Sequence, residues 1–207
     1  MPSAVRSNLL FALLFLLCVG CVPTISKPRG ERHLASLNEA EGHQHAGRYD
    51  DALKSYDVAA ASAERRVDRD EALYRKSRVL ARLERYDDAL VVLDDLGDDE
   101  PMGRRTLRAR LDAARYRLEL GQTERADADL QKLVEEHPDA GPGKSALRLL
   151  LSRHVKSAAT PDEALAWVRM FAARTQQHPT VEETLLNVEA EVLMQKGEPK
   201  EASAKIE

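Results

Sequence analysis

The sequence predicts an all-α fold, a superhelix of about five antiparallel helix pairs. Only 4% of the 207 residues are aromatic and 29 are alanine, a composition that disfavours β-sheets and suits closely packed helices. The segment Gly47–Ala52 (GRYDDA) returns 37 positions later as Glu84–Ala89 (ERYDDA), and related segments follow with a period of 37–38 residues. Such a period is typical of a helical repeat array.

The overall composition excludes several classes of protein. Charged residues make up 32% of the chain, which excludes a multispan membrane protein, and hydrophobic residues at 43% are enough to form a core. The net charge of -4 argues against a nucleic-acid partner. Both cysteines, Cys18 and Cys21, lie within the first 21 residues, so the body has no cysteine for a disulfide, metal or catalytic site.

The N-terminal segment has the organisation of a secretory signal. Arg6 precedes nine apolar residues, Leu9–Leu17, a run that is shorter than the roughly 20 residues of a spanning helix. Residues 22–32 contain two prolines and a glycine and have no apolar period, as expected of a flexible tether. The predicted organisation is a signal peptide over 1–20, an N-terminus and tether over 21–32, and a repeat domain over 33–207.

The end of this signal resembles the lipobox of bacterial lipoproteins in the residues Val19-Gly20-Cys21. That resemblance implies cleavage before Cys21, lipidation of its thiol, and a lipid anchor in the membrane. Val22 stands where the family's inner-membrane retention signal has aspartate, which favours an outer-membrane lipoprotein facing the periplasm. The alternative is an ordinary secretory peptide cut at Gly20, which leaves Cys21 as a free thiol.

Two columns of small residues recur in each repeat and predict where its helices cross. The first column lies on the first helices, and the second column lies on the second helices, twelve residues later in each repeat. Small side chains at a crossing let two backbones approach closely. The first helices supply Ala40, Ser77, Ala114, Ser152 and Ala190, and the second helices supply Ala52, Ala89, Ala126, Ala164 and Ala202.

The turn between the paired helices is marked by glycine in three repeats, at Gly47, Gly121 and Gly197. We expect a left-handed helix end at these positions. The segment Gly47-x-Tyr49-x-x-Ala52-x-x-x-Tyr56-x-x-Ala59 resembles the second half of the tetratricopeptide repeat motif. This resemblance implies an all-α superhelix whose first helices line a concave groove, and binding of another protein rather than catalysis.

The repeat length and the cysteine motif add a second resemblance. The period of 37–38 exceeds the roughly 34 residues of a tetratricopeptide repeat. Together with the lipobox, it resembles BamD-like envelope assembly proteins and periplasmic TolA-binding coordinators. The fifth repeat is incomplete, because its second helix runs only from about Pro199 to Glu207. We expect a longer gene product, or an open end that docks on a partner or a second copy.

Two motifs imitate ligand sites. The residues at 141–145 (GPGKS) resemble the end of a phosphate-binding loop, but Pro138 stands where that motif needs its first glycine, and no strand precedes it. His43 and His45 do not share a helix face, which argues against a metal pair. We therefore expect no nucleotide, metal or other cofactor, and no enzyme activity.

One constellation does predict a binding site. In the resembling family, the residue after the first small column faces the groove, and here the column reads Glu41, Arg78, Arg115, Arg153 and Glu191. Tyr74 lies near it, as do Arg75, Arg82 and Arg108. In an acidic protein this basic ladder predicts an acidic peptide or carboxylate partner. The alternative is a solvated face, since 22 of the 31 basic residues are arginine.

The function predicted from the sequence is that of a lipid-anchored, periplasm-facing scaffold that binds another protein or peptide of the cell envelope. One alternative is a BamD-like component of outer-membrane protein assembly. The other is a regulatory subunit of an envelope enzyme.

Overall fold

The predicted all-α fold is confirmed. The computed structural model describes residues 30–97, 104–175 and 178–206, and within these ranges it contains helices and no strand. The helices are α2 (Glu31–His45), α3 (Tyr49–Ala61), α4 (Arg66–Arg82), α5 (Tyr86–Gly97), α6 (Arg104–Glu119), α7 (Thr123–Glu136), α8 (Gly141–Leu151), the π-helix η1 (Ser152–Lys156), α9 (Pro161–Thr175), α10 (Pro179–Lys196) and α11 (Pro199–Ile206).

The predicted signal peptide and Cys21 lie outside the described residues. The tether was expected to end at Arg32, but the first helix of the repeat domain begins at Glu31. This acidic residue lies in the first turn of α2, where a negative charge interacts favourably with the helix dipole. None of the helices in the described ranges combines the length and the apolarity that a membrane span requires.

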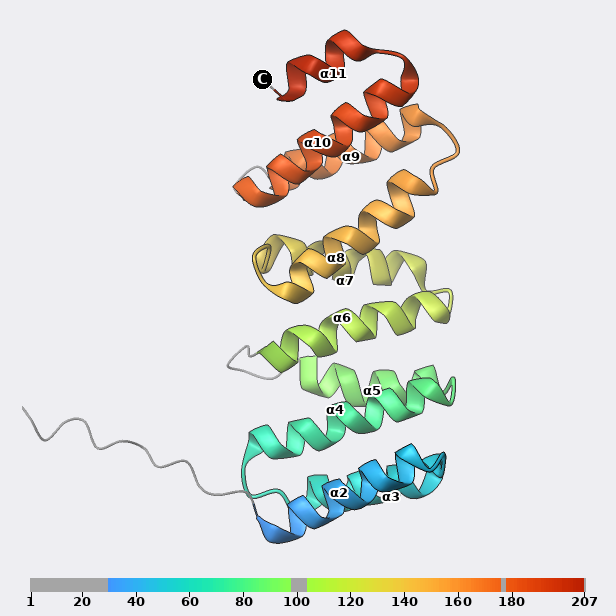
Figure 1. Ribbon diagram of the computed structural model, residues 1–207, viewed down its shortest axis with the longest axis vertical. Helices are drawn as coiled ribbons and strands as arrows, with labels where there is room; N and C mark the ends of the chain where they lie inside the picture. Colours follow the sequence, from blue (N-terminus) through green and yellow to red (C-terminus); the bar gives the residue numbers. More distant parts are fainter. Residues whose placement is uncertain (1–29, 98–103, 176–177, 207) are drawn as a thin grey trace, which may run out of the picture.

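The helices stack in chain order along the long axis of the molecule, from α2 at the bottom of Figure 1 to α11 at the top. Each first helix packs against its second helix, and close contacts also join successive first helices, α2 to α4, α4 to α6, and α6 to α8. The first helices therefore line one face of the stack, which we call the inner face. In Figure 1 this face is turned toward the viewer, with α8 and α10 drawn in front of α7 and α9.

The turns inside the pairs have the predicted left-handed conformation. Gly47, Gly121 and Gly197 have φ angles of 74°, 72° and 87°. Glu84 occupies the same place in the second repeat with φ 57°, so one turn forms without glycine. In each of these turns a backbone N–H bonds a carbonyl five residues earlier, as from Arg48 to His43 at 2.9 Å, which satisfies the end of the first helix.

Nine of the ten residues predicted at helix crossings are buried. Those on the second helices are Ala52, Ala89, Ala126, Ala164 and Ala202, and those on the first helices are Ala40, Ser77, Ala114 and Ala190. Several of them, such as Ala126, have no exposed surface at all. These positions leave no space for a larger side chain between the paired backbones.

Ser152 is the exception, and its prediction is wrong. It is exposed and begins the π-helix η1, in which each turn holds one residue more than an α-helical turn. Leu151 and Val155 pack against the core instead. The fourth repeat therefore has no buried small residue at this position of its first helix.

Candidate functional site

A cavity of about 420 Å³ lies on the inner face between α2, α4 and α6. We call it the basic cavity because five arginines and two glutamates contribute to its walls, an excess of three positive charges. The arginines are Arg75, Arg78, Arg82, Arg105 and Arg108, and the glutamates are Glu41 and Glu71.

Two of the arginines are held by the two glutamates. The Arg75 guanidinium donates to Glu41 on α2 and to Glu71 on its own helix. The Arg105 guanidinium, from α6, forms an ion pair with the same Glu71. These contacts tie the three first helices together and neutralise one side of the cavity.

The other three arginines have no carboxylate partner among the described residues. Arg78 and Arg82 lie one turn apart on α4, and Arg108 comes from α6. The Arg82 guanidinium lies over the ring of Tyr49, 5.9 Å from its centroid. Like charges gathered in this way repel one another, so an anion bound between them would relieve the repulsion. A guanidinium also has the planar donor geometry that matches a carboxylate.

Tyr74 forms part of the wall of the basic cavity. Its hydroxyl donates a hydrogen bond of 2.7 Å to Oδ2 of Asp112 on α6, and the Arg105 guanidinium lies 5.7 Å from its ring centroid. Burial, followed by the hydrogen bond to Asp112, raises the pKa of Tyr74 above its usual value, while Arg78 and Arg108 act to lower it. Tyr74 therefore remains a neutral donor, fixed in place beside the free guanidinium groups.

The charge of Arg78 influences three neighbouring tyrosines. Its charge acts to lower the pKa of Tyr56, Tyr74 and Tyr116, which places it within electrostatic reach of all three rings. Burial outweighs this charge and raises the pKa of Tyr116 to about 12. The Tyr56 hydroxyl donates to Gln44 at 3.0 Å. Tyr56 and Tyr74 line the basic cavity as neutral side chains, and the exposed Arg78 keeps its charge for a ligand.

The predicted ladder of three arginines is not one site. Arg78 lies in the basic cavity with Glu41 and Tyr74, whereas Arg115 lies outside it and donates to Asp112 at 3.2 Å. Arg153 belongs to η1, where its Nε donates to Asp127 on α7 at 2.9 Å. Asp127 lies on the second helix of the preceding repeat, so Arg153 is paired with a neighbouring repeat and its charge is not free for a ligand.

Sequence reasoning missed Arg105 and Glu71, which complete the basic cavity. The repeat period contains a signal for them, because Arg105 and Arg108 lie 37 residues after Asp68 and Glu71. Two acidic positions on one first helix thus correspond to two basic positions on the next. Only the structure shows that three of these four residues, Glu71, Arg105 and Arg108, line a single cavity.

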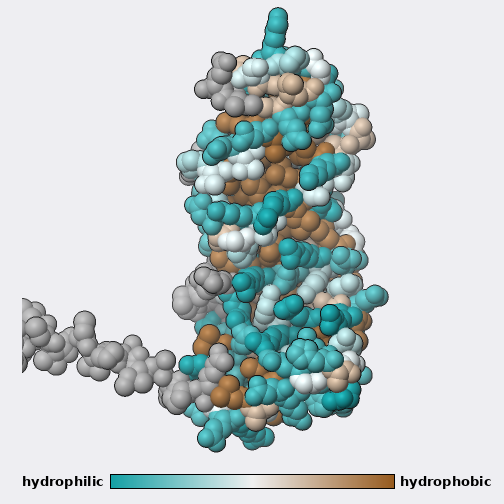
Figure 2. Space-filling model, viewed as in Figure 1, coloured by the Kyte–Doolittle hydropathy of each residue, from teal (hydrophilic) through white to brown (hydrophobic). Residues whose placement is uncertain are grey.

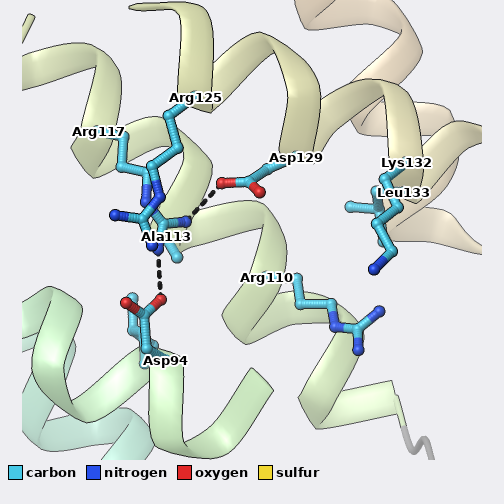
Figure 3. Close-up of a pocket in the computed structure, with 9 residues that line it drawn as sticks. Asp94, Arg110, Ala113, Arg117, Arg125, Asp129, Lys132 and Leu133 are labelled. Carbon is cyan, nitrogen blue, oxygen red and sulfur yellow. Dashed lines mark hydrogen bonds and ion pairs between the residues drawn. The ribbon is translucent and has the colours of Figure 1, made fainter. Parts of the chain in front are cut away.

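A second charged cavity, of about 250 Å³, lies between α5, α6 and α7 (Figure 3). At one end of it is Arg117, which is 5% exposed and donates to Asp94 on α5 at 2.5 Å and to Asp129 on α7 at 2.6 Å. Figure 3 shows Arg110 and Lys132 facing each other at the other end, and both lie within ion-pair distance of Glu136. We call Arg117 and its two aspartates the Arg117 node, since they join three helices.

The two motifs that imitate ligand sites have structural explanations. The residues at 141–145 form the first turns of α8, and Gly143 packs against the end of α7. No group of three or more potential metal-binding side chains occurs in the part of the chain that the structure describes.

Comparison with known proteins supports the same fold. Residues 108–140, which span most of α6 and all of α7, match the tetratricopeptide repeat family model. Two solved structures of MamA from strain RS-1, one from Desulfovibrio magneticus (residues 41 to the end) and one a double mutant, are each 18% identical to this chain. Their TM-scores are 0.50 and 0.51, and the alignments cover 85% of this chain and 92% and 91% of theirs.

A tetratricopeptide repeat protein from Parabacteroides merdae gives a TM-score of 0.48 at 14% identity, over 85% of this chain and 78% of its own. No curated protein matches the chain. The chain is thus built from tetratricopeptide-like repeats, and the resemblance predicted from the sequence is confirmed at the level of the repeat and its fold.

Proposed function

We propose that this protein is a binding scaffold whose basic cavity takes up an acidic segment of another protein. The observation that supports it is the set of three arginines, Arg78, Arg82 and Arg108, that have no carboxylate partner among the described residues. They lie in a cavity whose walls are preformed by paired arginines and hydrogen-bonded tyrosines. A preformed site loses little conformational entropy when it binds, so the charge complementarity contributes to affinity.

We further propose that the scaffold is an outer-membrane lipoprotein that faces the periplasm. The lipobox-like residues Val19-Gly20-Cys21 support the lipid anchor, and Val22 supports the outer-membrane destination. Lipid chains at Cys21 would hold the chain at the membrane, and residues 22–30 would leave the stack of helices free to meet envelope proteins.

The charge-reversed variant Arg78→Glu/Arg108→Glu tests the binding site. We expect it to bind a fluorescently labelled eight-residue peptide of aspartate and glutamate at least about tenfold more weakly than the original protein, because two attractive contacts become repulsive. Fluorescence anisotropy measures the affinity. Binding to the original protein should also weaken as salt is raised from about 0.05 to 0.5 M, because the free arginines are partly solvated.

The matched control is Arg69→Glu/Arg125→Glu, which makes the same change in net charge. Both residues are exposed and outside the basic cavity, and Arg69 lies nine residues from Arg78, half a turn around α4. This control should bind the acidic peptide within about twofold of the original protein at moderate salt, where distant charges are screened. Equal binding by both variants, or none by the original protein, would refute the site.

The variant Cys21→Ala tests the lipid anchor. We expect it to accumulate as an unprocessed precursor or to leave the membrane fraction, since a single thiol carries the lipid. Mass spectrometry of the N-terminal peptide of the native protein should find a lipidated cysteine at the new N-terminus. A soluble mature protein with an unmodified Cys21 would exclude the lipoprotein proposal, and binding by the basic cavity would be unaffected.

A further inference from the structure

A second cavity on the inner face has a different chemistry. It has a volume of about 510 Å³ and lies between the end of α8, η1 and α10. Its walls include the apolar side chains of Leu151, Val155, Ala164, Val188 and Val192. We call it the apolar groove. Its volume falls within the range of roughly 300–1,000 Å³ that is common for ligand sites.

The apolar groove lies where the stacking of the first helices changes. Close backbone contacts join each first helix to the next as far as α8, whereas α8 and α10 share a core cluster of side chains that includes Leu150 and Leu185. The helix α9 makes its close contacts with η1 and α10. The π-turn is fixed from the other side by Asp127, which accepts from Arg153 at 2.9 Å and lies 2.9 Å from Nε2 of His154. The ring of His154 also stacks on Trp167, with centroids 4.9 Å apart.

The apolar groove and the basic cavity belong to one surface. Both are formed by first helices, and Figure 2, which views the molecule from the same side as Figure 1, shows how side chains are distributed on it. Hydrophilic residues predominate over α4 and α6, whereas apolar residues gather in the upper part, over α8 and α10. A segment that crosses this face meets positive charge first and an apolar depression after it.

The charges on the rim of the apolar groove are unevenly distributed. Arg148 and Lys156 lie on the side of α8 and η1, nearer the basic cavity, and Glu191 lies on the side of α10. An acidic segment bound in the basic cavity can continue past the two cations toward the groove. A second acidic group beyond the groove would meet Glu191 and be repelled.

From this surface we infer that the apolar groove binds a large apolar side chain that lies about six residues from the acidic part of the same partner segment. The inference rests on the proposed function, because the basic cavity is the first of its two anchors. The occupant is therefore an extended segment of another protein with an acidic part, a short spacer and one or two leucine-like residues.

The spacing follows from the geometry of the stack. Packed helices lie about 8–10 Å apart, so the middle of the basic cavity, at α4, is about 20–25 Å from the middle of the groove, between α8 and α10. An extended chain covers about 3.3 Å per residue, so six or seven residues span this distance. A spacer of two residues is too short, and linked anchors gain affinity only when the linker reaches both sites.

Synthetic peptides test the inference, and their binding is measured with the whole protein. The first peptide joins three glutamates to Leu-Leu through six Gly/Ser residues, the second has Ser-Ser in place of Leu-Leu, and the third has a two-residue spacer. We expect the first peptide to bind at least about tenfold more tightly than the other two, because it alone reaches both anchors. Equal affinity of all three peptides would overturn the inference.

The variant Val188→Asp should remove this tenfold gain and leave the affinity of the second peptide unchanged. Met194→Asp is the matched control, since it makes the same kind of change on α10 at a residue that is 58% exposed and outside the groove. Because Val188 is half-buried, a second variant, Ala159→Trp, covers the groove from an exposed position. A gain that survives in both folded variants would overturn the inference.

The outcomes separate this inference from the proposed function. If the original protein binds none of the glutamate peptides, the basic cavity fails as an anchor. In that case a Leu-Leu peptide without glutamates is titrated while the methyl signals of Val155, Val188 and Val192 are followed by NMR. Shifts confined to these methyl groups would support the groove alone, and an absence of shifts would refute it.

Discussion

Replacing Gly143 by alanine will destabilise the junction between α7 and α8 more than any other single-methyl addition that the structure identifies among the described glycines. A Cβ at this position would overlap the carbonyl oxygen of His137 and lie 2.9 Å from its carbon and 3.3 Å from the carbonyl oxygen of Leu133. These are backbone atoms, so no side-chain rotation can relieve the overlap. We expect a cost of about 3 kcal/mol, the upper part of the range for overpacked sites.

The control is Gly141→Ala, two residues earlier in the same helix. A Cβ there meets no atom of the described residues within 4 Å, and the residue lies at the start of α8. Alanine favours a helix over glycine by up to about 1 kcal/mol, so this variant should be neutral or slightly more stable. Urea unfolding followed by circular dichroism and by the single tryptophan, Trp167, measures both variants. Equal midpoints for the two would contradict the close approach at Gly143.

Gly143 has a role in helix packing, although its motif resembles a phosphate-binding loop. Gly143 lies in a motif that contains a glycine, a lysine and a serine in the order of a nucleotide site. In the structure its lack of a side chain lets α8 begin directly against the end of α7. The sequence was sufficient to reject the nucleotide site, but it could not reveal the contact, because His137 and Gly143 approach each other only after the chain has turned.

The repeat and the helix pairing were predictable from the sequence because both follow from local periodicity. A small residue recurs at Ala52, Ala89 and Ala126 with a constant interval, and each is fully buried. The failure at Ser152 has an equally physical cause. Its interval to Ala164 matches the other repeats, but Ser152 begins a π-helix, in which each turn holds one residue more than an α-helical turn.

The basic cavity was predictable in part, because the repeat period shows which residues share the inner face. The column that contains Arg78 and the neighbouring Tyr74 does face a cavity on the inner face. Which charges remain free could not be predicted, because it depends on contacts between helices such as that of Arg105 with Glu71. Arg153 has the same sequence register as Arg78, yet Asp127 of another helix neutralises it. Periodicity thus locates a face, and ion pairing decides which part of that face can bind.

Replacing Arg117 will have the second largest effect on stability. This buried side chain from α6 bonds Asp94 on α5 and Asp129 on α7, so one residue fixes the angles between three helices (Figure 3). Its Nε has no hydrogen-bond partner among the residues that the structure describes, and its two terminal nitrogens supply the bonds. We expect Arg117→Ala to cost about 2–3 kcal/mol, from two charge-assisted hydrogen bonds and the packing of the stem.

Arg117→Met separates the two contributions, because it retains an unbranched apolar stem. It should cost about 1–2 kcal/mol, since the side chains of Asp94 and Asp129 are 45% and 36% exposed and water can solvate both after the arginine is removed. Arg125→Met is the control, an exposed arginine of the same cavity with no ion pair among the described residues, and should change stability by less than about 0.5 kcal/mol.

Urea unfolding in low and high salt completes the test of the Arg117 node. In the Arg117 variants, hydrogen exchange of the backbone amides in α5 and α7 should be faster than in the original protein, because the helices that the node joins would open more often. The contribution of the Arg117 node to the stability of the original protein should be similar in low and high salt, since Arg117 is buried and its ion pairs are only partly screened. If Arg117→Met and Arg125→Met unfold at the same urea concentration, the node does not stabilise the stack, and apolar packing alone sets the order of α5, α6 and α7.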